Sequence, residues 1–384
     1  MLCAARMQAQ TPLSEKSAIE LAFKNSPLLQ AAVLEVQQKK QLKKSAFSPD
    51  DPEVIMESPT GEFMTLGVSQ SFEFPTVYVK NSQLAKQEVL LAEKNQAVTA
   101  AEVSQLVATS YLALQYYTRI MLERARQDSL QLMILNSAEK QFAAGQIDFI
   151  ASTMASVRHG EIQNELALAI SDASLAMHRL KLYTGITDSI VPDPLIRSIE
   201  HTEIANPLAD SVSSPAPLLQ YQAQAVSVAR KNLQLEKHKI LPGISFGYMN
   251  QGAADTQFPM RLRGGISIPL WFWKYQASIQ AAKTEVKIEG EKLKAQQQNV
   301  SIQIHELSGN VTKYSASLFY FETRGLKNAR DLVSASGRMF QAGQTDYVSY
   351  MRSLAEAGNI EIRYLETLRN YNQAIIDLKY LNGQ

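Results

Sequence analysis

The sequence FAAGQIDF at residues 142–149 recurs as FQAGQTDY at residues 340–347, an offset of 198 residues. The same offset relates Leu180 to Leu378 and Gly185 to Gly383, so the match continues well beyond the motif. Upstream, PLLQ at residues 27–30 recurs at residues 217–220. A match of this extent predicts a tandem duplication. We place a tail at residues 1–12, the first repeat at residues 13–186, a Pro- and Ser-rich linker at residues 187–214 and the second repeat at residues 215–384.

Each copy of the motif lies inside a long tract without proline, which disrupts helix interiors. No proline occurs between Pro75 and Pro192 or after Pro269, and both tracts are rich in Ala, Leu, Gln, Glu and Lys, which are good helix formers. We therefore predict a short helix, a long helix, a tight turn and a return helix in each repeat. The expected short helices cover residues 27–46 and 217–240, the long helices 77–141 and 275–340, and the return helices 147–185 and 345–382.

The expected long helices would each measure roughly 100 Å at 1.5 Å per residue, so they must pack along their length against other helices. In the second one, apolar residues alternate steps of three and four positions, the pattern of a coiled-coil seam. They are Ile304, Leu307, Val311, Tyr314, Leu318 and Phe321.

Between the short and long helices of each repeat, the apolar period changes to strict alternation, which predicts strands at residues 63–74 and 260–270. Weaker partner strands are expected at residues 52–58 and 243–250. Aromatic residues such as Trp271 and Trp273 follow the second strand, as in the aromatic girdle of a membrane barrel. The expected lipid-facing residues are Met64, Leu66, Val68, Phe72, Leu262, Ile266 and Ile268.

The opposite face of the second strand carries Arg261 and Arg263. In a barrel these residues would line the lumen, where rings of positive charge can bias ion passage. Alternatively, they would balance Glu53 and Glu57 on a neighbouring strand.

An alternating strand also suits a soluble sheet that packs on a core. Four strands flanked by such long helices have no obvious core to cover, and an open sheet edge in lipid would leave backbone groups unpaired. Since the smallest single-chain bacterial barrels have about eight strands, we expect several chains to share one barrel. The predicted fold class is mainly α: an α-helical barrel of duplicated long-helix hairpins, with four β-strands per chain in a shared transmembrane β-barrel.

The two repeated motifs predict helical turns, because glycine permits a left-handed helix end and aspartate caps the next helix. A helical hairpin alone explains Gly145, Asp148, Gly343 and Asp346. The functional alternative is that these turns also dock a partner and gate an entrance. The residues concerned would be Gly145, Gln146, Asp148, Gly343, Gln344, Asp346 and Tyr347.

Taken together, the sequence resembles the TolC family of outer-membrane efflux proteins from about Leu13 to Gly383. The resemblance rests on the duplication, the paired FxAGQ turns, and the strand-to-helix junctions SFEFP at residues 71–75 and SIPL at residues 267–270. The FEFP junction is most similar to the heavy-metal branch, the CusC and CzcC type. In two respects the chain differs from the family: residues 349–352 lack the acidic pair often found there, and no C-terminal equatorial extension follows residue 383.

The resemblance implies a homotrimer in the outer membrane of a Gram-negative bacterium, with a twelve-stranded barrel and a helical tunnel in the periplasm. It also implies two partners, a periplasmic adaptor (membrane fusion protein) and an inner-membrane RND pump that supplies the energy. The expected function is a passive exit duct of a tripartite efflux system. The alternative is a periplasmic coiled-coil scaffold or adaptor-like protein without a barrel. The cargo, metal ion or drug, cannot be read from the duct because the pump and adaptor select it.

Composition argues against other classes of protein. Lys plus Arg at 38 against Asp plus Glu at 37 lacks the basic excess of a nucleic-acid binder. The five histidines are scattered without metal-ligand spacing, the methionines are attributed to packing, and no phosphate loop or nucleophile elbow occurs. We expect no metal, no cofactor and no enzymatic activity. Residues 1–12 are interpreted as a signal-peptide remnant, with lipid attachment to Cys3 as the alternative.

Overall fold

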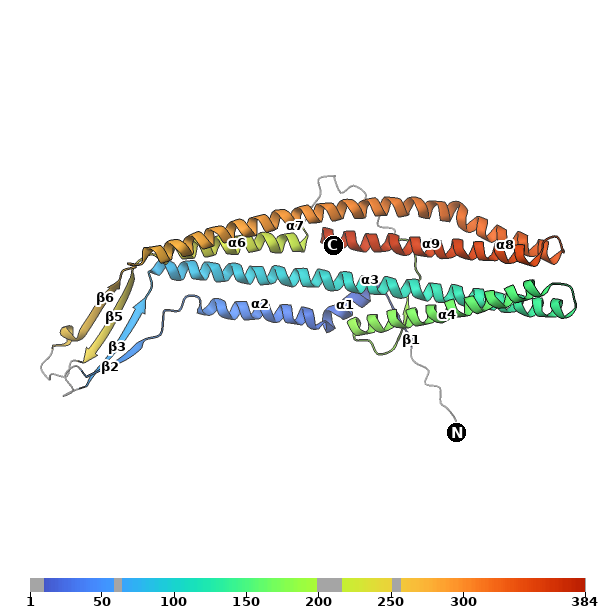
Figure 1. The fold of residues 1–384 in the computed structure, drawn as a ribbon. Helices are drawn as coiled ribbons and strands as arrows, with labels where there is room; N and C mark the ends of the chain where they lie inside the picture. Colours follow the sequence, from blue (N-terminus) through green and yellow to red (C-terminus); the bar gives the residue numbers. More distant parts are fainter. Residues whose placement is uncertain (1–9, 59–63, 199–215, 251–256, 384) are drawn as a thin grey trace, which may run out of the picture. The chain divides into compact units, whose positions relative to one another are not determined.

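The computed structural model of the 384-residue chain describes residues 10–58, 64–198, 216–250 and 257–383 (Figure 1). Most of the expected signal remnant, including Cys3, lies outside these residues, as do both loops that connect the predicted strand pairs and most of the linker. The chain divides into two compact units. The sheet unit comprises Leu28–Thr99 and Pro215–Val300, and the hairpin unit comprises Met1–Pro27, Ala100–Ser214 and Ser301–Gln384. Each is described by itself.

Helices form most of the described chain, as the sequence predicts. The helices are α1 (Glu15–Asn25), α2 (Pro27–Ser45), α3 (Pro75–Ala143), α4 (Phe149–Thr184), α6 (Pro217–His238), α7 (Phe272–Tyr320), α8 (Leu326–Gln341) and α9 (Tyr347–Asn382). The strands are β1 (Gln10–Leu13), β2 (Glu53–Glu57), β3 (Thr65–Phe72), β4 (Ser189–Pro192), β5 (Gly243–Asn250) and β6 (Leu262–Ser267).

One predicted helix is interrupted. We expected residues 275–340 to be continuous, but a π-helical turn, η2 (Phe321–Gly325), separates α7 from α8. The first repeat uses 69 residues for α3, whereas α7, η2 and α8 use 49, 5 and 16, one residue more. A π turn accommodates one extra residue without ending the helix. The spacing of apolar residues that predicted a helix here gave no sign of this extra residue.

The sheet unit is built around a four-stranded antiparallel sheet in the order β2-β3-β5-β6. Its helices follow the same order. Lys39 of α2 pairs with Glu88 of α3 at 3.4 Å, Thr76 of α3 lies 2.9 Å from the His238 ring of α6, and the Gln222 amide of α6 donates to a Glu289 carboxylate oxygen of α7 at 2.8 Å. The pairing of β3 with β5 therefore joins the two repeats edge to edge.

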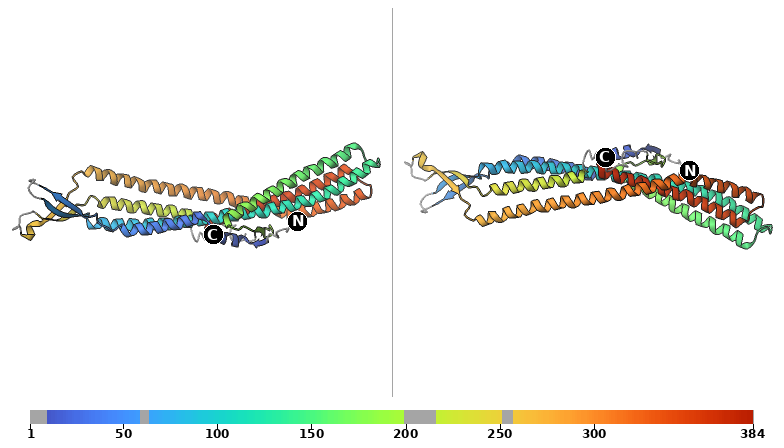
Figure 2. Two further views of the ribbon diagram at one scale, coloured as in Figure 1. Left: turned by 90° about the horizontal axis from the view of Figure 1, so that it is seen from below. Right: turned by 90° about the horizontal axis from the view of Figure 1, so that it is seen from above.

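In the hairpin unit, α3, α4, α8 and α9 run side by side (Figures 1 and 2). Near the two turns the apolar faces of α3, α4 and α9 share one cluster, against which Val333 and Phe340 of α8 pack. It is formed by Ile134, Ala138, Ala151, Ala155, Tyr347, Met351 and Leu354. The predicted coiled-coil seam contributes to a second cluster, in which buried Leu318 packs with Leu368, Tyr371 and Ile375 of α9. Packing of apolar faces, which stabilises helices more than propensity does, thus holds the hairpins together.

Part of α3 is apolar enough to resemble a membrane span. By length and composition it is the one such helix in the described chain, with an 18-residue window of mean hydropathy 1.2, of which 44% is buried within the protein. Core helices of soluble proteins pass the same test, so this is weak evidence of spanning. Val103, Val107, Tyr111 and Leu114 of α3 belong to a buried cluster with α1 and α4, which accounts for apolar positions along this helix.

The hairpin unit also contains a two-stranded parallel sheet, which we did not predict from the sequence. Strand β1 pairs with β4, so Gln10–Leu13 is a strand and not part of a tail. The hydroxyl of Tyr111, 1% exposed on α3, donates to the Leu13 carbonyl at 2.7 Å and accepts from the Asp193 amide at 2.8 Å. The side chain of Tyr111 thus connects α3 both to β1 and to the residue that follows β4. Burial raises the pKa of Tyr111 to about 12.

Tyr111→Phe is expected to lower the free energy of unfolding by about 1–3 kcal/mol, because the carbonyl of the buried Leu13 and the amide of Asp193 would both lose their partner. The ring stays in place, so no cavity forms. Denaturant unfolding followed by circular dichroism measures the effect. The control is Tyr221→Phe, on α6 in the sheet unit, for which we expect a change below about 0.5 kcal/mol. Equal effects of the two substitutions would contradict the role given to Tyr111.

Candidate functional site

The sheet presents one mainly apolar face across all four strands, with Gln70 and Asn250 as its polar positions. Val54 of β2 lies opposite Val68 of β3, which lies opposite Tyr248 of β5, which lies opposite Leu262 of β6. A second row joins Phe72 to Ile244 and Ile266. Further apolar side chains on this face are Met56, Leu66 and Phe246.

This apolar face is open to the surroundings in the single chain. Leu66 is 54% exposed and Ile266 is 71% exposed, far more than the side chains of the hairpin unit's core. Met64 precedes β3 and Ile268 follows β6, and both are about two-thirds exposed. The structure thus places all seven residues predicted to face lipid at the surface, on or beside one sheet face: Met64, Leu66, Val68, Phe72, Leu262, Ile266 and Ile268. An apolar surface of this kind marks an interaction site, and lipid contact stays a prediction.

The opposite face of the sheet carries mostly small and polar side chains, with Ile55 and Met249 beside Gly67 as its apolar exceptions. Ser69 lies opposite Gly247, Ser71 opposite Ser245, and Ser267 opposite Gly243. At Gly67 the strands approach so closely that a Cβ atom would lie 2.9 Å from the Tyr248 carbonyl oxygen. A small, polar face is suited to lining an aqueous lumen and leaves room for the sheet to curve toward it.

The two candidate lumen arginines differ in position. Strand β6 begins at Leu262, not at Met260 as predicted, because residues Phe258–Arg261 form a 3₁₀ turn, η1. Arg261 therefore lies in that turn and donates to the Tyr248 hydroxyl at 3.4 Å. Arg263 lies in the strand opposite Gly247, on the small, polar face. Since β2 and β6 occupy opposite edges, the arginines cannot balance Glu53 and Glu57 on a neighbouring strand of the same chain.

The two repeated turns have the geometry that the sequence predicts. Gly145 has φ of 70° and Gly343 has φ of 71°, the left-handed region that favours glycine. Asp148 caps α4 by accepting from the Ala151 amide at 2.7 Å, and Asp346 caps α9 by accepting from the Ser349 amide at 2.9 Å. Gly145, Gln146, Asp148, Gly343, Gln344 and Asp346 are all exposed. Docking and gating by these residues stay predictions.

The aromatic residues beside the two turns behave differently. Phe149 at the first turn is 69% exposed and contacts Phe142 at a ring separation of 6.2 Å. Its counterpart Tyr347 is 5% exposed and packs in the cluster shared by α3, α4 and α9, where burial raises the pKa of the Tyr347 hydroxyl to about 12. Tyr347, which we grouped with the exposed docking residues, is thus a core residue of the turn.

Asp148→Ala and Asp346→Ala should each lower the free energy of unfolding by about 1 kcal/mol, the usual cost of losing an N-cap. Thermal unfolding followed by circular dichroism checks this. Asp172→Ala, an exposed substitution inside α4, is the matched control and should change stability by less than about 0.5 kcal/mol. A control as damaging as the cap variants would show that charge loss, not capping, is responsible.

A charged cluster between α3 and α9 was not predicted. The Arg126 guanidinium donates to Glu123 on its own helix at 2.7 Å and to Glu361 on α9 at 2.6 Å. The Gln127 amide also donates to Glu123, at 3.1 Å. The Glu123 side chain is 7% exposed and that of Glu361 is 27% exposed. The cluster links the first repeat to the second, and a cavity of about 560 Å³ lined by α3, α4, α8 and α9 lies beside it.

The two carboxyl groups of this cluster titrate in opposite directions. Burial raises the pKa of Glu123, but hydrogen bonds from Arg126, Glu361 and Gln127 outweigh it, so the net pKa lies below its usual value. Burial, together with the hydrogen bond to Glu123 and its charge, raises the pKa of Glu361 to about 7. Near neutral pH, Glu361 therefore exchanges a proton while Glu123 stays ionised. Sequence periodicity gave no signal for this contact, because its partners are 238 residues apart.

We find no constellation suited to metal binding in the part of the chain that the structure describes. No three His, Cys, Asp or Glu side chains lie together there as a metal site would require. His159 lies 3.4 Å from Asp128 as an isolated contact between α3 and α4. The candidate site is accordingly a pair of surfaces, the apolar sheet face and the two turns.

Solved structures share this fold. No protein-family model matches the sequence, and no curated protein matches it. The outer membrane channel CmeC of Campylobacter jejuni aligns with a TM-score of 0.81 at 12% identity, over 96% of this chain and 85% of that chain. CusC, described for transmembrane channel formation, aligns with a TM-score of 0.77 at 15% identity, over 96% and 91%. The outer membrane protein VceC of Vibrio cholerae aligns with a TM-score of 0.77 at 13% identity, over 96% of each chain.

These alignments establish the fold class over nearly the whole chain. The structural neighbours are TolC-type outer-membrane channels, built from long helices and a few strands per chain. At identities of 12–15% the likeness concerns the fold alone.

Proposed function

We propose that this chain is one protomer of a trimeric outer-membrane exit duct of the TolC type, in a tripartite efflux system. The observation that carries the proposal is the exposed, mainly apolar face that extends across β2, β3, β5 and β6. A soluble protein would cover such a face with its own core. In a duct, hydrocarbon covers it.

The edges of the sheet support closure by several chains. Strands β2 and β6 each pair on one side only, and in lipid an unpaired edge costs several kcal/mol per unsatisfied backbone group. Three chains with four strands each would form a closed barrel of twelve strands. Strand β6 of one chain would then lie beside β2 of the next, which brings Arg263 and Glu53 or Glu57 to the same junction. The arginine would then balance these glutamates across the boundary between two protomers, not within one chain.

The small, polar sheet face would line a water-filled lumen that conducts substrates passively. The long hairpins would continue this passage in the periplasm, with Gly145 and Gly343 at the turns that meet an adaptor and an inner-membrane RND pump. The heavy-metal cargo suggested by the FEFP junction belongs to the proposal as well. Likeness to CusC does not favour it, because the TM-score of CmeC is higher and that of VceC is the same.

Membrane fractionation with heat-modifiable electrophoresis tests the proposal. We expect the protein in the outer-membrane fraction, and in detergent a species near three times 42.7 kDa that collapses to the monomer on boiling. A monomer released by osmotic shock would overturn the proposal and favour the periplasmic scaffold. Conductance in planar bilayers then distinguishes an open duct from a barrel that does not conduct.

A further inference from the structure

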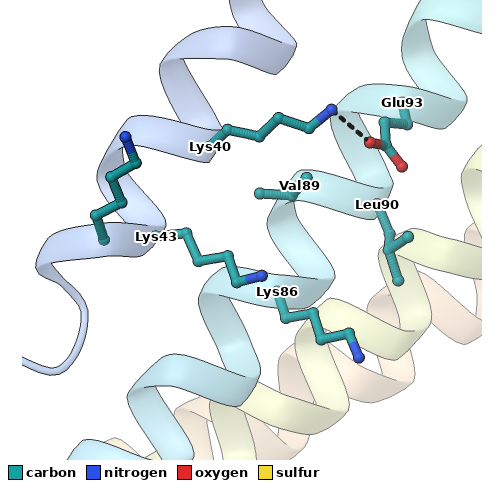
Figure 3. Close-up of a pocket in the computed structure, with 7 residues that line it drawn as sticks. Lys40, Lys43, Lys86, Val89, Leu90 and Glu93 are labelled. Atoms are coloured by element: carbon teal, nitrogen blue, oxygen red, sulfur yellow. Dashed lines mark ion pairs between the residues drawn. The ribbon is translucent and has the colours of Figure 1, made fainter.

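Helix α3 and its counterpart in the second repeat, α7, differ in the helices that they contact. In the sheet unit α3 contacts α2, where Lys40 pairs with Glu93 at 3.0 Å (Figure 3). It also contacts α6, where the Gln224 amide donates to the side-chain oxygen of Gln87 at 2.8 Å. The contact of α6 with α7 corresponds to that of α2 with α3, because each lies within one repeat. The contact of α3 with α6 joins the two repeats.

The surfaces that correspond to the contact of α3 with α6 are exposed. The starts of α3 and α7 differ by 197 residues, and the PLLQ motifs that open α2 and α6 differ by 190. Gln87 is half-buried, whereas its counterpart, Thr284 of α7, is exposed. Gln224 is half-buried, whereas its counterpart, Leu34 of α2, is 62% exposed. One side of α7 and one side of α2 are thus open where their counterparts pack together.

The same relation holds in the hairpin unit, where α3 contacts α9. The Gln105 amide donates to the Asp377 carboxylate at 2.9 Å, and the Gln373 amide donates to the Thr109 hydroxyl at 3.0 Å. All four residues are half-buried. Residue numbers rise along α3 as they fall along α9, so the two helices are antiparallel and each hydrogen-bonded pair lies at one level.

The counterparts of these four residues are exposed and complementary in chemistry. For Gln105 and Thr109 they are Ile302 and Glu306 of α7, and for Gln373 and Asp377 they are Leu175 and Arg179 of α4. Ile302 is 56% exposed and Leu175 is 64% exposed. Among the residues that the structure describes, neither Arg179 nor Glu306 forms an ion pair. One apolar residue and one charged residue, of opposite sign on the two helices, are therefore available on each surface.

The edges of the sheet indicate what covers these open sides. Strand β2 follows α2 and strand β6 precedes α7, and these are the two edge strands. If β6 of one chain pairs with β2 of the next, α7 of the first chain lies beside α2 of the second. A contact between two different surfaces of identical chains closes into a ring when the rotation between the chains allows it.

We propose that α7 of each protomer packs against a second copy of this chain, in the register of the contacts that α3 makes within one chain. This rests on the proposed function. In the sheet unit, Thr284 lies beside Leu34 of the next protomer. In the hairpin unit, Ile302 lies opposite Arg179 of the next protomer, and Glu306 lies opposite its Leu175.

The proposed contact joins Glu306 to Arg179 by an ion pair. The two residues lie one helical turn apart, about 6 Å along the helices, which the long arginine side chain spans. Ile302 and Leu175 flank the pair and exclude water from it, which strengthens the attraction between the charges. Association also removes these two apolar side chains from water.

Cysteine cross-linking of the full-length protein in detergent tests the register. The background is Cys3→Ser, which removes the only cysteine. Glu306→Cys combined with Leu175→Cys should give covalent dimers and trimers with a short bis-maleimide, seen on denaturing gels after boiling. The matched control combines Ile302→Cys with Leu168→Cys. Leu168 is 58% exposed on α4 and lies eleven residues before position 179, about 16 Å of helix, so the control should stay monomeric on the gel.

Charge exchange tests the ion pair. Glu306→Arg and Arg179→Glu should each lower the temperature at which the trimer dissociates in detergent by several degrees, because like charges then face each other. The double variant restores the pair in reversed order and should recover most of this loss. Heat-modifiable electrophoresis measures all three variants. Misfolding caused by one substitution would not be recovered by the second.

The outcomes separate this proposal from the proposed function. A trimer that does not cross-link through positions 306 and 175, or that cross-links equally well through the control pair, overturns the proposed register and leaves the duct standing. Additive losses in the double charge variant would show that the two charges do not meet, which overturns the ion pair. A wild type that forms no trimer refutes the proposed function itself, and this proposal with it.

Discussion

Leu66→Arg is expected to lower the free energy of unfolding of the membrane-inserted protein, by about 2–4 kcal/mol if Leu66 lies at mid-bilayer on the lipid face of the barrel and by about 0–1 kcal/mol if it lies near the interface. Leu66 is 54% exposed and lies between Met56 and Asn250 in the sheet, so the new side chain clashes with nothing inside the chain. The cost would come entirely from moving charge into hydrocarbon. Ile266→Arg on β6 should behave alike, with a smaller cost if it lies nearer the interface.

The matched control is Ser69→Arg on the opposite face of the same strand. Ser69 lies opposite Glu53 on one side and Gly247 on the other, so an arginine there has water and a carboxylate within reach. We expect little loss of stability and a changed ion selectivity in planar bilayers. Urea unfolding of the protein folded into lipid vesicles measures all three variants. Equal tolerance of arginine on both faces would show that the apolar face does not contact lipid.

The parts of the fold that the sequence predicted are those with local, periodic signals. Alternation placed β3 and β6, proline placed the start of α2, α3 and α6, and the Gly and Asp of the repeated motif predicted both turns with their caps. Strand alternation also identified the exposed apolar face, because side chains of successive residues point to opposite sides of a sheet. Register and strand order then followed only from the structure.

The parts that the sequence did not predict depend on contacts between distant residues or on single insertions. Strands β1 and β4 are four residues each and pair across the whole first repeat, so neither carries a period of its own. The π turn at Phe321–Gly325 has the composition of an ordinary helix, so its one extra residue could not be recognised in the sequence. Tyr347 looked like a turn residue, but the neighbouring hairpin buries it.

The contact between α3 and α9 is expected to weaken as the pH rises from about 4.5 to about 7. The pKa of Glu361 is raised from 4.5 to about 7, so the folded protein holds a proton that the unfolded chain releases at lower pH. The stabilisation is therefore complete below pH 4.5 and is lost as the pH passes the folded-state value. The expected total change is roughly 1–3 kcal/mol per chain. The pKa of Glu123 is lowered, so its stabilising contribution is lost as the pH falls below 4.5. The two carboxyl groups therefore affect stability in different pH ranges.

Glu361→Gln isolates this effect, because glutamine keeps the size and can still donate to Glu123, but it does not titrate. Hydrogen exchange of the α3 and α9 amides around residues 123 and 361 should accelerate with pH in the wild type relative to the variant. Comparing the two proteins at the same pH cancels the intrinsic pH dependence of exchange. Glu356→Gln, an exposed carboxyl on α9, controls for the loss of one charge. If the wild type and Glu361→Gln kept a constant ratio of exchange rates from pH 4.5 to 8, the raised pKa would have no bearing on how the two hairpins are held together.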